Sequence, residues 1–289
     1  MFSGSIVALV TPFKKGKVDY DKIAELCEFH VASGTDAIVP CGTTGEAPTL
    51  SYDEHKKVID VVIATVKKRV PVIAGTGSNS TDETIMLTEY AKKAGADGAL
   101  ITTPYYNKPT QRGLFEHYKM VDDTVALPVI LYNVPGRTGV SLAPETVAKL
   151  SKLTHVVAIK EAAGSIDQVS AILSLCDITV LSGDDSLTLP MIAVGAKGVI
   201  SVAANIAPKD TRDLCAYALK GDYAKAKELH YKLFSLCKIL FVETNPLPVK
   251  TAMAMAGMVE EEFRLPLCPM GDENKAKLKT VLKEYGILK

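Results

Sequence analysis

Short apolar runs rich in β-branched residues alternate with longer amphipathic segments along most of this 289-residue chain. Such alternation is typical of repeated βα units built around a parallel sheet. We therefore predict eight strands, one for each apolar run that is bounded by turn residues. They are Ser5 to Val10, Asp36 to Val39, Pro71 to Gly75, Gly98 to Thr102, Pro128 to Asn133, Val156 to Glu161, Ile178 to Ser182 and Gly198 to Val202.

The segments between these runs have the spacing of helices that bury one face. Asp21 to Ser33, Asp53 to Lys68 and Thr81 to Ala94 are clear examples, and the last of them stops at Gly95, a residue that favours helix ends. Eight strand–helix units in roughly 220 residues fit a closed barrel better than an open sheet, which would leave strands unused. The pattern predicts an α/β fold, a (β/α)8 TIM barrel over residues 1–221.

Residues 222–289 are organised differently, because their helical patterns are not separated by strands. We predict three helices, from Asp222 to Val242, from Pro246 to Met258 and from Glu273 to Tyr285. No glycine- or serine-rich linker precedes them, so we expect them to pack on the barrel or on a neighbouring subunit. The predicted organisation is a catalytic barrel (residues 1–221) with a C-terminal three-helix extension (residues 222–289) packed on it.

Charge and hydropathy narrow the classes of function. The chain has 33 Lys and Arg against 33 Asp and Glu, and this balance argues against capture of nucleic acid or of an anionic membrane. Its longest stretches without charge are too short to span a bilayer, which takes about 18 apolar residues. The beginning of the sequence lacks a basic region before its apolar part, so we expect no secretory signal and a cytoplasmic protein.

In a barrel of this kind the active site lies at the carboxyl ends of the strands, so polar residues there carry the most weight. Lys160 lies near the end of the run Val156 to Glu161. Burial favours the neutral amine of a lysine, which can attack a carbonyl carbon and form a Schiff base. The alternative is a buried lysine paired with a carboxylate such as that of Glu161, and the residues alone leave both open.

Each of the other polar residues at strand ends could have a catalytic or binding role, or it could have no role in function. Tyr132 could act as an acid or base if Thr43 and Tyr106 supply a hydrogen-bonded chain, or its hydroxyl could simply face water. The amides of the turn from Gly42 to Gly45 could hold a carboxylate, or the turn could be an ordinary βα loop. Arg137 could bind a second carboxylate through two hydrogen bonds, or it could be a solvated surface charge.

Signals for a metal or a nucleotide cofactor are weak. The five histidines show no metal-binding spacing, and none of them ends a predicted strand. Gly75-Thr76-Gly77 lacks the third glycine of the dinucleotide fingerprint, and the sequence contains no P-loop. Asp184 and Asp185 precede Ser186 and are better explained as helix caps than as metal ligands. We expect neither a metal nor a cofactor.

Several motifs resemble those of the dihydrodipicolinate synthase / N-acetylneuraminate lyase family, and the resemblance covers nearly the whole chain. They are Gly42 to Glu46, Tyr105 to Pro109, Tyr132 to Gly139, Val157 to Glu161, Leu181 to Asp185, Gly198 to Val202 and Glu243 to Lys250. The resemblance implies a lyase that forms a Schiff base on Lys160. The Thr43-Thr44 pair, Tyr106 after Tyr105, and Arg137 favour the dihydrodipicolinate synthase branch.

The resemblance to this branch implies that pyruvate and L-aspartate 4-semialdehyde condense, as the first committed step towards lysine and diaminopimelate. The alternative within the family is a pyruvate-dependent aldolase or lyase acting on a sugar acid of the N-acetylneuraminate or keto-deoxygluconate type. A rival outside enzymes is a sensor of carbonyl ligands, which would need only some of these residues. No cofactor is implied beyond the pyruvate imine on Lys160.

The resemblance also assigns roles to single residues. Lys160 forms the imine, Tyr132 carries the proton, and Thr43 and Tyr106 complete the relay. Thr43 and Thr44 hold the pyruvate carboxylate, and Arg137 holds that of the second substrate. The carbonyl groups of two further residues, Gly183 and Ile200, face the pocket.

Assembly and regulation are implied in the same way. Tyr106 reaches the relay from a neighbouring subunit, so the family resemblance implies a homotetramer, a dimer of dimers. Five residues match the site at which lysine inhibits sensitive family members, namely Tyr52, His55, Asn79, Glu83 and Tyr105. The alternative for this set is a role in capping the helix from Thr81 to Ala94.

Overall fold

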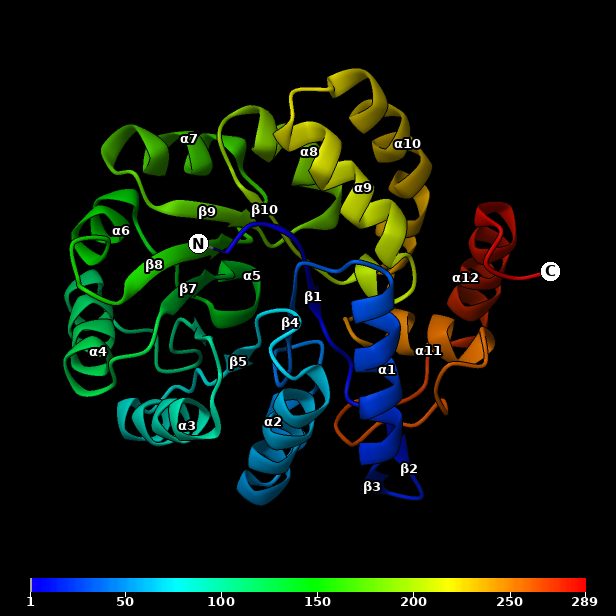
Figure 1. The fold of residues 1–289 in the computed structure, drawn as a ribbon, viewed down its shortest axis with the longest axis horizontal. Helices are drawn as coiled ribbons and strands as arrows, with labels where there is room; N and C mark the ends of the chain where they lie inside the picture. Colours follow the sequence, from blue (N-terminus) through cyan, green and yellow to red (C-terminus); the bar gives the residue numbers. More distant parts are fainter. Residues whose placement is uncertain (1) are drawn as a thin grey trace.

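The computed structural model describes residues 2–289. Eight parallel strands lie between helices: β1 (Gly4–Ala8), β4 (Ala37–Val39), β5 (Ile73–Gly75), β6 (Gly98–Thr102), β7 (Val129–Asn133), β8 (Val156–Glu161), β9 (Thr179–Ser182) and β10 (Gly198–Ser201). They pair in the order β4-β1-β10-β9-β8-β7-β6-β5. A bridge between Ile38 and Val72 joins the two ends of this order. The predicted (β/α)8 barrel is therefore confirmed (Figure 1).

The strand boundaries differ from the predicted ones by at most two residues, because chain pairing and not apolar composition sets where each strand ends. A short antiparallel hairpin of β2 (Phe13–Lys14) and β3 (Lys17–Val18) was not expected. Each of its strands has two residues, which is too short to give a recognisable pattern.

Helices surround the strands (Figure 1): α1 (Tyr20–Ala32), α2 (Tyr52–Val66), α3 (Thr81–Ala94), α4 (Gln111–Thr124), α6 (Pro144–Leu150), α7 (Ile166–Leu175), α8 (Thr188–Ala193) and α9 (Pro208–Leu219). Short turns interrupt the loops at the carboxyl ends of the strands, namely α5 (Pro135–Thr138) and the 3-10 turns η1 (Ala47–Thr49), η2 (Asp185–Leu187) and η3 (Ala203–Asn205). Ser51 begins α2 with a capping box, and Ser80 caps α3.

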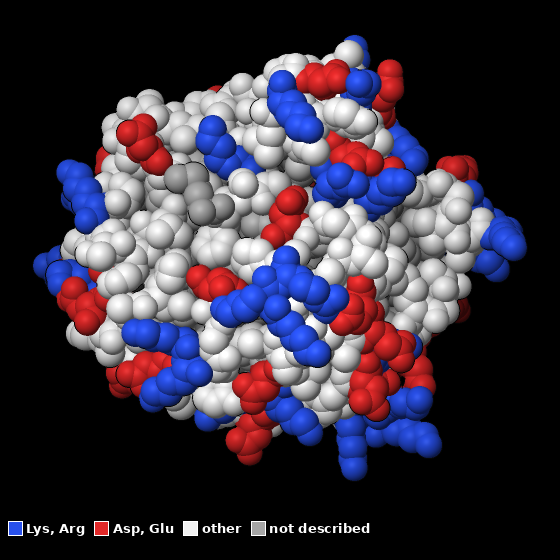
Figure 2. Space-filling model, in the orientation of Figure 1, with Lys and Arg blue, Asp and Glu red and all other residues white. Residues whose placement is uncertain are grey.

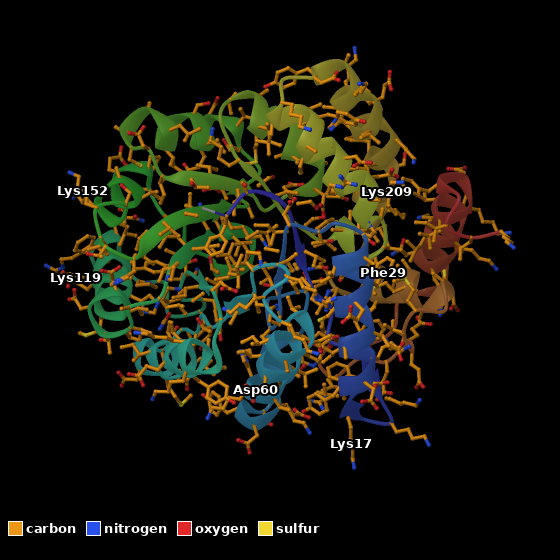
Figure 3. The ribbon with its side chains drawn as sticks, in the orientation of Figure 1. Lys17, Phe29, Asp60, Lys119, Lys152 and Lys209 are labelled. Carbon is orange, nitrogen blue, oxygen red and sulfur yellow. The ribbon has the colours of Figure 1, made fainter. Side chains whose placement is uncertain are left out.

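Many charged side chains lie on the outer surface of this helical layer. Figure 3 shows Lys119 and Lys152 pointing away from the barrel. Basic and acidic groups are interspersed over the face shown in Figure 2, in keeping with the balanced composition. None of the helices formed by residues 2–289 is both long and apolar enough to cross a membrane.

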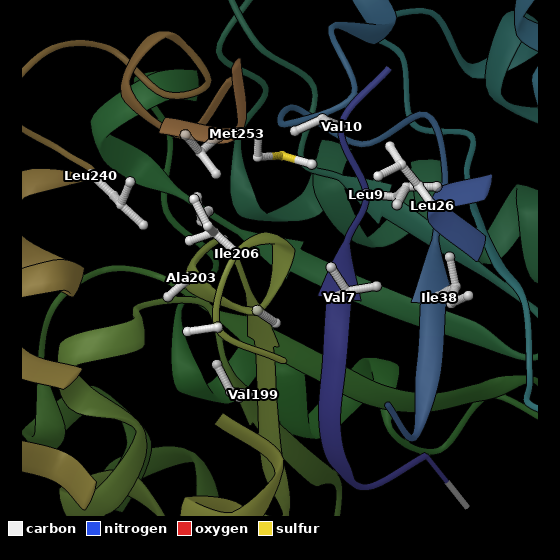
Figure 4. Close-up of a cluster of buried hydrophobic side chains, with 14 of the residues drawn as sticks. Val7, Leu9, Val10, Leu26, Ile38, Val199, Ala203, Ile206, Leu240 and Met253 are labelled. Carbon is white, nitrogen blue, oxygen red and sulfur yellow. The ribbon is translucent and has the colours of Figure 1, made fainter. Parts of the chain in front are cut away.

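Three helices follow α9: α10 (Tyr223–Ile239), α11 (Leu247–Met255) and α12 (Asp272–Tyr285). They lie along one side of the barrel, at the right of Figure 1. Leu240 and Met253 are buried in the same cluster as Ile206 and Leu9 of the barrel, as Figure 4 shows. The extension thus packs on the barrel of its own chain, while the domain boundary at residues 221/222 stays a prediction.

A fully buried ion pair ties the extension to the barrel. Lys250 of α11 lies 2.6 Å from a carboxylate oxygen of Glu46, and both side chains are 0% exposed. The ammonium also donates to the carbonyl of Glu262 at 2.8 Å and lies over the ring of Phe13. Burial lowers the pKa of Lys250, and the charge of Glu46 opposes that shift. Because Glu46 follows the Thr43-Thr44 pair in the chain, the extension holds the loop that carries the pair.

A second ion pair, nearer the surface, also connects the extension to the barrel. Arg264 donates to both carboxylate oxygens of Glu54, each at 2.6 Å. This bidentate contact lowers the pKa of Glu54 to about 2. Arg264 also donates to the carbonyl of Thr49, in the turn that follows Glu46.

Two buried histidines make the stability of the fold depend on pH. The Nδ1 atoms of His30 and His117 contact the hydroxyls of Thr35 and Thr81, while both Nε2 atoms are buried without a partner among residues 2–289. Burial lowers the pKa of each imidazole to about 4. In the unfolded chain the value is about 6.5, so between these values the unfolded state binds more protons than the folded state.

We predict that the free energy of unfolding falls as the pH is lowered from 7 to 5, by about 1–2 kcal/mol for each histidine. Urea unfolding at a series of pH values measures this dependence. Replacing both histidines (His30→Gln with His117→Gln) should make the curve less steep between pH 7 and 5, whatever its effect at pH 8. An equally steep curve for parent and variant would contradict the account.

Candidate functional site

A cavity of about 250 Å³ opens at the carboxyl ends of the strands. We call it the Lys160 cavity. Six of the residues selected from the sequence line it: Thr43, Thr44, Tyr132, Arg137, Lys160 and Gly183. They come from four different loops or strand ends, as expected for an active site built on a barrel.

Strand pairing places Tyr132 beside Lys160. In the parallel register of β7 and β8, Tyr132 is the partner of Lys160 and Asn133 is the partner of Glu161. Successive side chains on a strand point to opposite faces, so the first pair faces the barrel interior and the second faces the helices. Asn133 Nδ2 donates to both oxygens of Glu161, at 3.1 and 2.9 Å. These bonds fix the register at the ends of the two strands.

Lys160 is buried without a carboxylate partner. Its side chain is 5% exposed, and its Nζ lies 4.2 Å from the centroid of the Tyr132 ring. Glu161 instead accepts from Asn133 and from the amide of Ala163, at 2.8 Å for the latter. The alternative of an ion pair between Lys160 and Glu161 is therefore not found in the described chain.

Gly183 leaves room for the lysine side chain. A Cβ atom at this position would lie 3.0 Å from Lys160 Cε and 2.6 Å from the Cβ atom of Ala162. Both separations are too short for carbon atoms, so a larger residue would displace Lys160 or its neighbour. Absence of a side chain at position 183 is thus a condition for the observed lysine position.

The loop after β4 presents free backbone donors. Neither the Thr43 nor the Thr44 amide donates a hydrogen bond to another group within residues 2–289. The flanking residues Cys41 and Glu46 both have positive φ angles, of 55° and 53°. Gly75 permits this path, because a Cβ atom there would lie 2.2 Å from the Cys41 carbonyl oxygen. Consecutive free amides of this kind can hold an anion.

The charges around the Lys160 cavity favour anionic ligands. Arg137, Lys160 and Lys238 line it, against the single carboxylate of Asp184. Arg137 donates to the carbonyl oxygen of Asn245 at 3.1 Å, which orients the guanidinium towards the cavity wall. The arrangement therefore brings two free backbone amides, a guanidinium and a lysine amine to one cavity.

Two of the selected residues do not line the cavity. Ile200 lies on β10, is fully buried in the barrel interior, and precedes Val202, which does line the cavity. Tyr106 is 90% exposed, has a φ of 73°, and lines neither this cavity nor the neighbouring one. The relay from Tyr132 to Tyr106 is therefore not assembled within one chain.

A second cavity of about 410 Å³ adjoins the first and shares Thr43, Tyr132, Val134 and Arg137 with it. We call it the outer cavity. Four members of the predicted effector set line it, namely Tyr52, His55, Glu83 and Tyr105. The fifth, Asn79, is not among the lining residues, and its carbonyl accepts from Asn107 at 2.9 Å.

Glu83 is ionised and held in place at the wall of the outer cavity. Ser78 Oγ donates to its carboxylate at 2.6 Å, and this bond together with that of Tyr52 lowers the pKa of Glu83. The same contact with Glu83 raises the pKa of Tyr52. The cap of α3 is Ser80, which accepts from the amide of Glu83, so Glu83 also belongs to the first turn of this helix and the capping alternative stays open.

Of the two adjacent aspartates, Asp184 acts as a cap, as expected, whereas Asp185 bonds to the segment after β10. Asp184 accepts from the amide of Ser186 at the start of η2. Asp185 is buried and accepts from the hydroxyl of Ser201 and from the amides of Val202 and Ala203. The described part of the chain contains no group of three or more His, Cys, Asp or Glu side chains able to hold a metal ion.

Asn245 lines the Lys160 cavity although the sequence did not single it out. It lies between α10 and α11, far from every predicted strand end. Its only signal was membership of the motif Glu243 to Lys250, which carries no catalytic pattern of its own. Its place in the cavity results from packing of the extension on the barrel.

Known proteins resemble this chain over its whole length. A protein from Geotalea uraniireducens named 4-hydroxy-tetrahydrodipicolinate synthase is 60% identical over 290 residues, with 100% of both chains covered. The crystal structure of dihydrodipicolinate synthase from Aquifex aeolicus superposes with a TM-score of 0.98 at 55% identity, covering 99% of each chain. That of the chloride-inhibited enzyme from Acinetobacter baumannii, complexed with pyruvate, gives 0.98 at 48% identity over 100% of each chain.

The family model described as the dihydrodipicolinate synthetase family matches residues 1–285. It covers the barrel, the Thr43-Thr44 loop, the strand that carries Lys160 and nearly all of the extension. The resemblance expected from the motifs is thereby confirmed. This chain belongs to the dihydrodipicolinate synthetase family.

Proposed function

We propose that this chain is a lyase that condenses pyruvate with L-aspartate 4-semialdehyde to give 4-hydroxy-tetrahydrodipicolinate. The observation that carries the proposal is Lys160, which is buried beside Tyr132 and has no carboxylate partner among residues 2–289. The names of the full-length relatives favour this reaction over cleavage of a sugar acid. A binding module without turnover would not need a nucleophile, an acid and two anion sites together.

The first step joins pyruvate to the protein. The free amides of Thr43 and Thr44 hold its carboxylate, which presents the keto carbon C2 to Lys160. The Nζ atom attacks C2, and loss of one water gives an iminium. The covalent imine is the only electron sink that the reaction requires, and no cofactor takes part.

The second step makes the carbon–carbon bond. The iminium withdraws electrons from C3, which gives a proton to the relay that contains Tyr132 and becomes an enamine. C3 then attacks the aldehyde carbon of the second substrate, and the aldehyde oxygen takes up a proton from Tyr132. Thr43 connects Tyr132 to Tyr106 in this proposal. Arg137 holds the carboxylate of the semialdehyde by a bidentate contact.

Ring closure releases the product. The amine of the former semialdehyde attacks C2 and displaces the Lys160 amine, so that the whole reaction liberates one water. We assign the carbonyl groups of Gly183 and Ile200 to the lining of the reacting centre. Gly183 lines the cavity, which supports the assignment, whereas Ile200 is the residue two before the lining Val202.

We propose that the chain works as a homotetramer, a dimer of dimers. A tyrosine that is 90% exposed at a loop tip leaves a large apolar ring in water, and a neighbouring subunit would cover it. The Tyr106 hydroxyl would then complete the relay of the adjacent subunit. We place the reaction in the cytoplasm, where pyruvate and amino-acid precursors are available.

Replacing the nucleophile tests the reaction. The variants Lys160→Ala and Lys160→Arg should lose condensation activity by about a thousandfold or more, because neither can form the imine. A coupled assay with pyruvate and L-aspartate 4-semialdehyde measures it. The parent should not cleave N-acetylneuraminate or keto-deoxygluconate at a comparable rate. Parental activity of Lys160→Ala, or a clear preference of the parent for a sugar acid, would refute the proposal.

The space left by Gly183 gives a second test. Gly183→Ala should lower kcat by about tenfold or more, because the new methyl group collides with Lys160 and Ala162. Gly136→Ala is the matched control, since nothing lies within 4 Å of a Cβ atom at that position, one residue before Arg137. Equal rates for the two variants would show that the lysine position tolerates displacement.

We further propose that lysine binds in the outer cavity and inhibits the reaction. Glu83 would bind an ammonium group of the effector, and its carboxylate is already held in the ionised form. The coupling route is short, because Thr43, Tyr132 and Arg137 line both cavities. A ligand in the outer cavity therefore contacts the same side chains that act on the substrates.

Glu83→Gln should raise the lysine concentration for half-inhibition by about tenfold, with the rate in the absence of lysine changed by less than about threefold. Steady-state inhibition curves measure both quantities. Asp82→Asn is the control, because it removes a carboxylate from the same turn of α3 at an exposed position outside the cavity. A parent whose rate does not change at saturating lysine would remove the proposal.

A further inference from the structure

The C-terminal extension contributes a side-chain amide to the Lys160 cavity. Asn245 is 5% exposed and is bonded to both of the proposed carboxylate sites. Its side-chain Nδ2 donates to Thr44 Oγ1 at 3.0 Å, and its main-chain carbonyl oxygen accepts from the Arg137 guanidinium at 3.1 Å. The residue therefore lies between the expected positions of the two substrates.

The Oδ1 atom of Asn245 is buried and accepts no hydrogen bond from residues 2–289. A buried acceptor without a partner costs about 1–3 kcal/mol, and such groups are rare in folded proteins. This acceptor belongs to a residue that lines a cavity with free volume beside it. A hydrogen-bond donor on a ligand bound in the cavity would satisfy this acceptor.

The chemistry of the two proposed substrates identifies that donor. Pyruvate carries a carboxylate and a keto group, and both are acceptors only. L-Aspartate 4-semialdehyde carries an α-ammonium group on the same carbon as its carboxylate. If Arg137 holds that carboxylate, the ammonium must lie next to it, and Asn245 is the residue already bonded to Arg137.

We propose that Asn245 Oδ1 accepts a hydrogen bond from the α-amino group of the semialdehyde and selects the amino-bearing substrate. This inference rests on the function proposed above and names a determinant of its specificity. A neutral acceptor suits the later step, because the amine must lose a proton before it attacks C2. A carboxylate at the same position would stabilise the ammonium and oppose that loss.

Succinic semialdehyde is an analogue of L-aspartate 4-semialdehyde that keeps the carboxylate and the aldehyde but lacks the amino group. It therefore separates recognition of the amine from recognition of the other two groups. Asn245→Ala should lower kcat/KM for L-aspartate 4-semialdehyde by about tenfold or more. The inhibition constant of succinic semialdehyde, measured as a competitor of the natural substrate, should change by less than about threefold. Equal losses for both compounds, or no loss for either, would overturn the inference.

A second variant keeps the shape of the side chain. Asn245→Asp should shift the pH dependence of kcat to higher pH, because its carboxylate holds the proton on the substrate amine. Thr244→Ala, an exposed neighbour on the same segment, is the control and should leave the profile and the discrimination unchanged. A pH profile of Asn245→Asp that matches the parent would count against contact with the amine.

Exchange of the C3 hydrogens of pyruvate in D₂O separates this inference from the proposed function. It needs the imine and the enamine but no second substrate. Asn245→Ala should exchange within about threefold of the parent. A parent that does not exchange would refute the proposed function itself. An exchange rate that falls as far as condensation would show that Asn245 acts on pyruvate through Thr44, and would overturn the inference alone.

Discussion

The pairing of β7 with β8 is the constraint on which the site depends. It puts Tyr132 opposite Lys160 on the inner face and Asn133 opposite Glu161 on the outer face. The carboxylate of Glu161 accepts hydrogen bonds from Asn133 and from the Ala163 amide, and it forms no ion pair with Lys160. The amine lies beside the ring of Tyr132, in a cavity that Arg137 also lines, and there we propose that the imine forms.

The C-terminal extension contributes residues to this site, among them Lys238 and Asn245. The Lys250–Glu46 pair is fully buried, and removing one partner of such a pair costs about 3–5 kcal/mol in typical proteins. That pair anchors Glu46, which follows Thr43 and Thr44 in the same loop. Asn245, which lines the cavity, donates to the hydroxyl of Thr44. One segment of the extension therefore shapes both the anion site and its surroundings.

The fold could be predicted from the sequence because strands that are buried on both faces appear as continuous apolar runs, and turns between them are marked by glycine and proline. Strand ends also indicated Lys160 and Tyr132, since the barrel brings all such ends to one mouth. Asn245 and the Lys250–Glu46 pair could not be predicted, because each contact joins residues about 200 positions apart. Tyr106 and Asn79 were selected by resemblance to the family, but neither of them lines a cavity in the described part of this chain.

Mass spectrometry after borohydride reduction tests the central claim most directly. The protein is mixed with pyruvate alone, reduced, and digested, and the modified residue is located in the peptides. The account predicts a stable pyruvate-derived adduct on Lys160, lost when pyruvate is omitted. Absence of any adduct, or an adduct on another lysine with Lys160 unmodified, would contradict it.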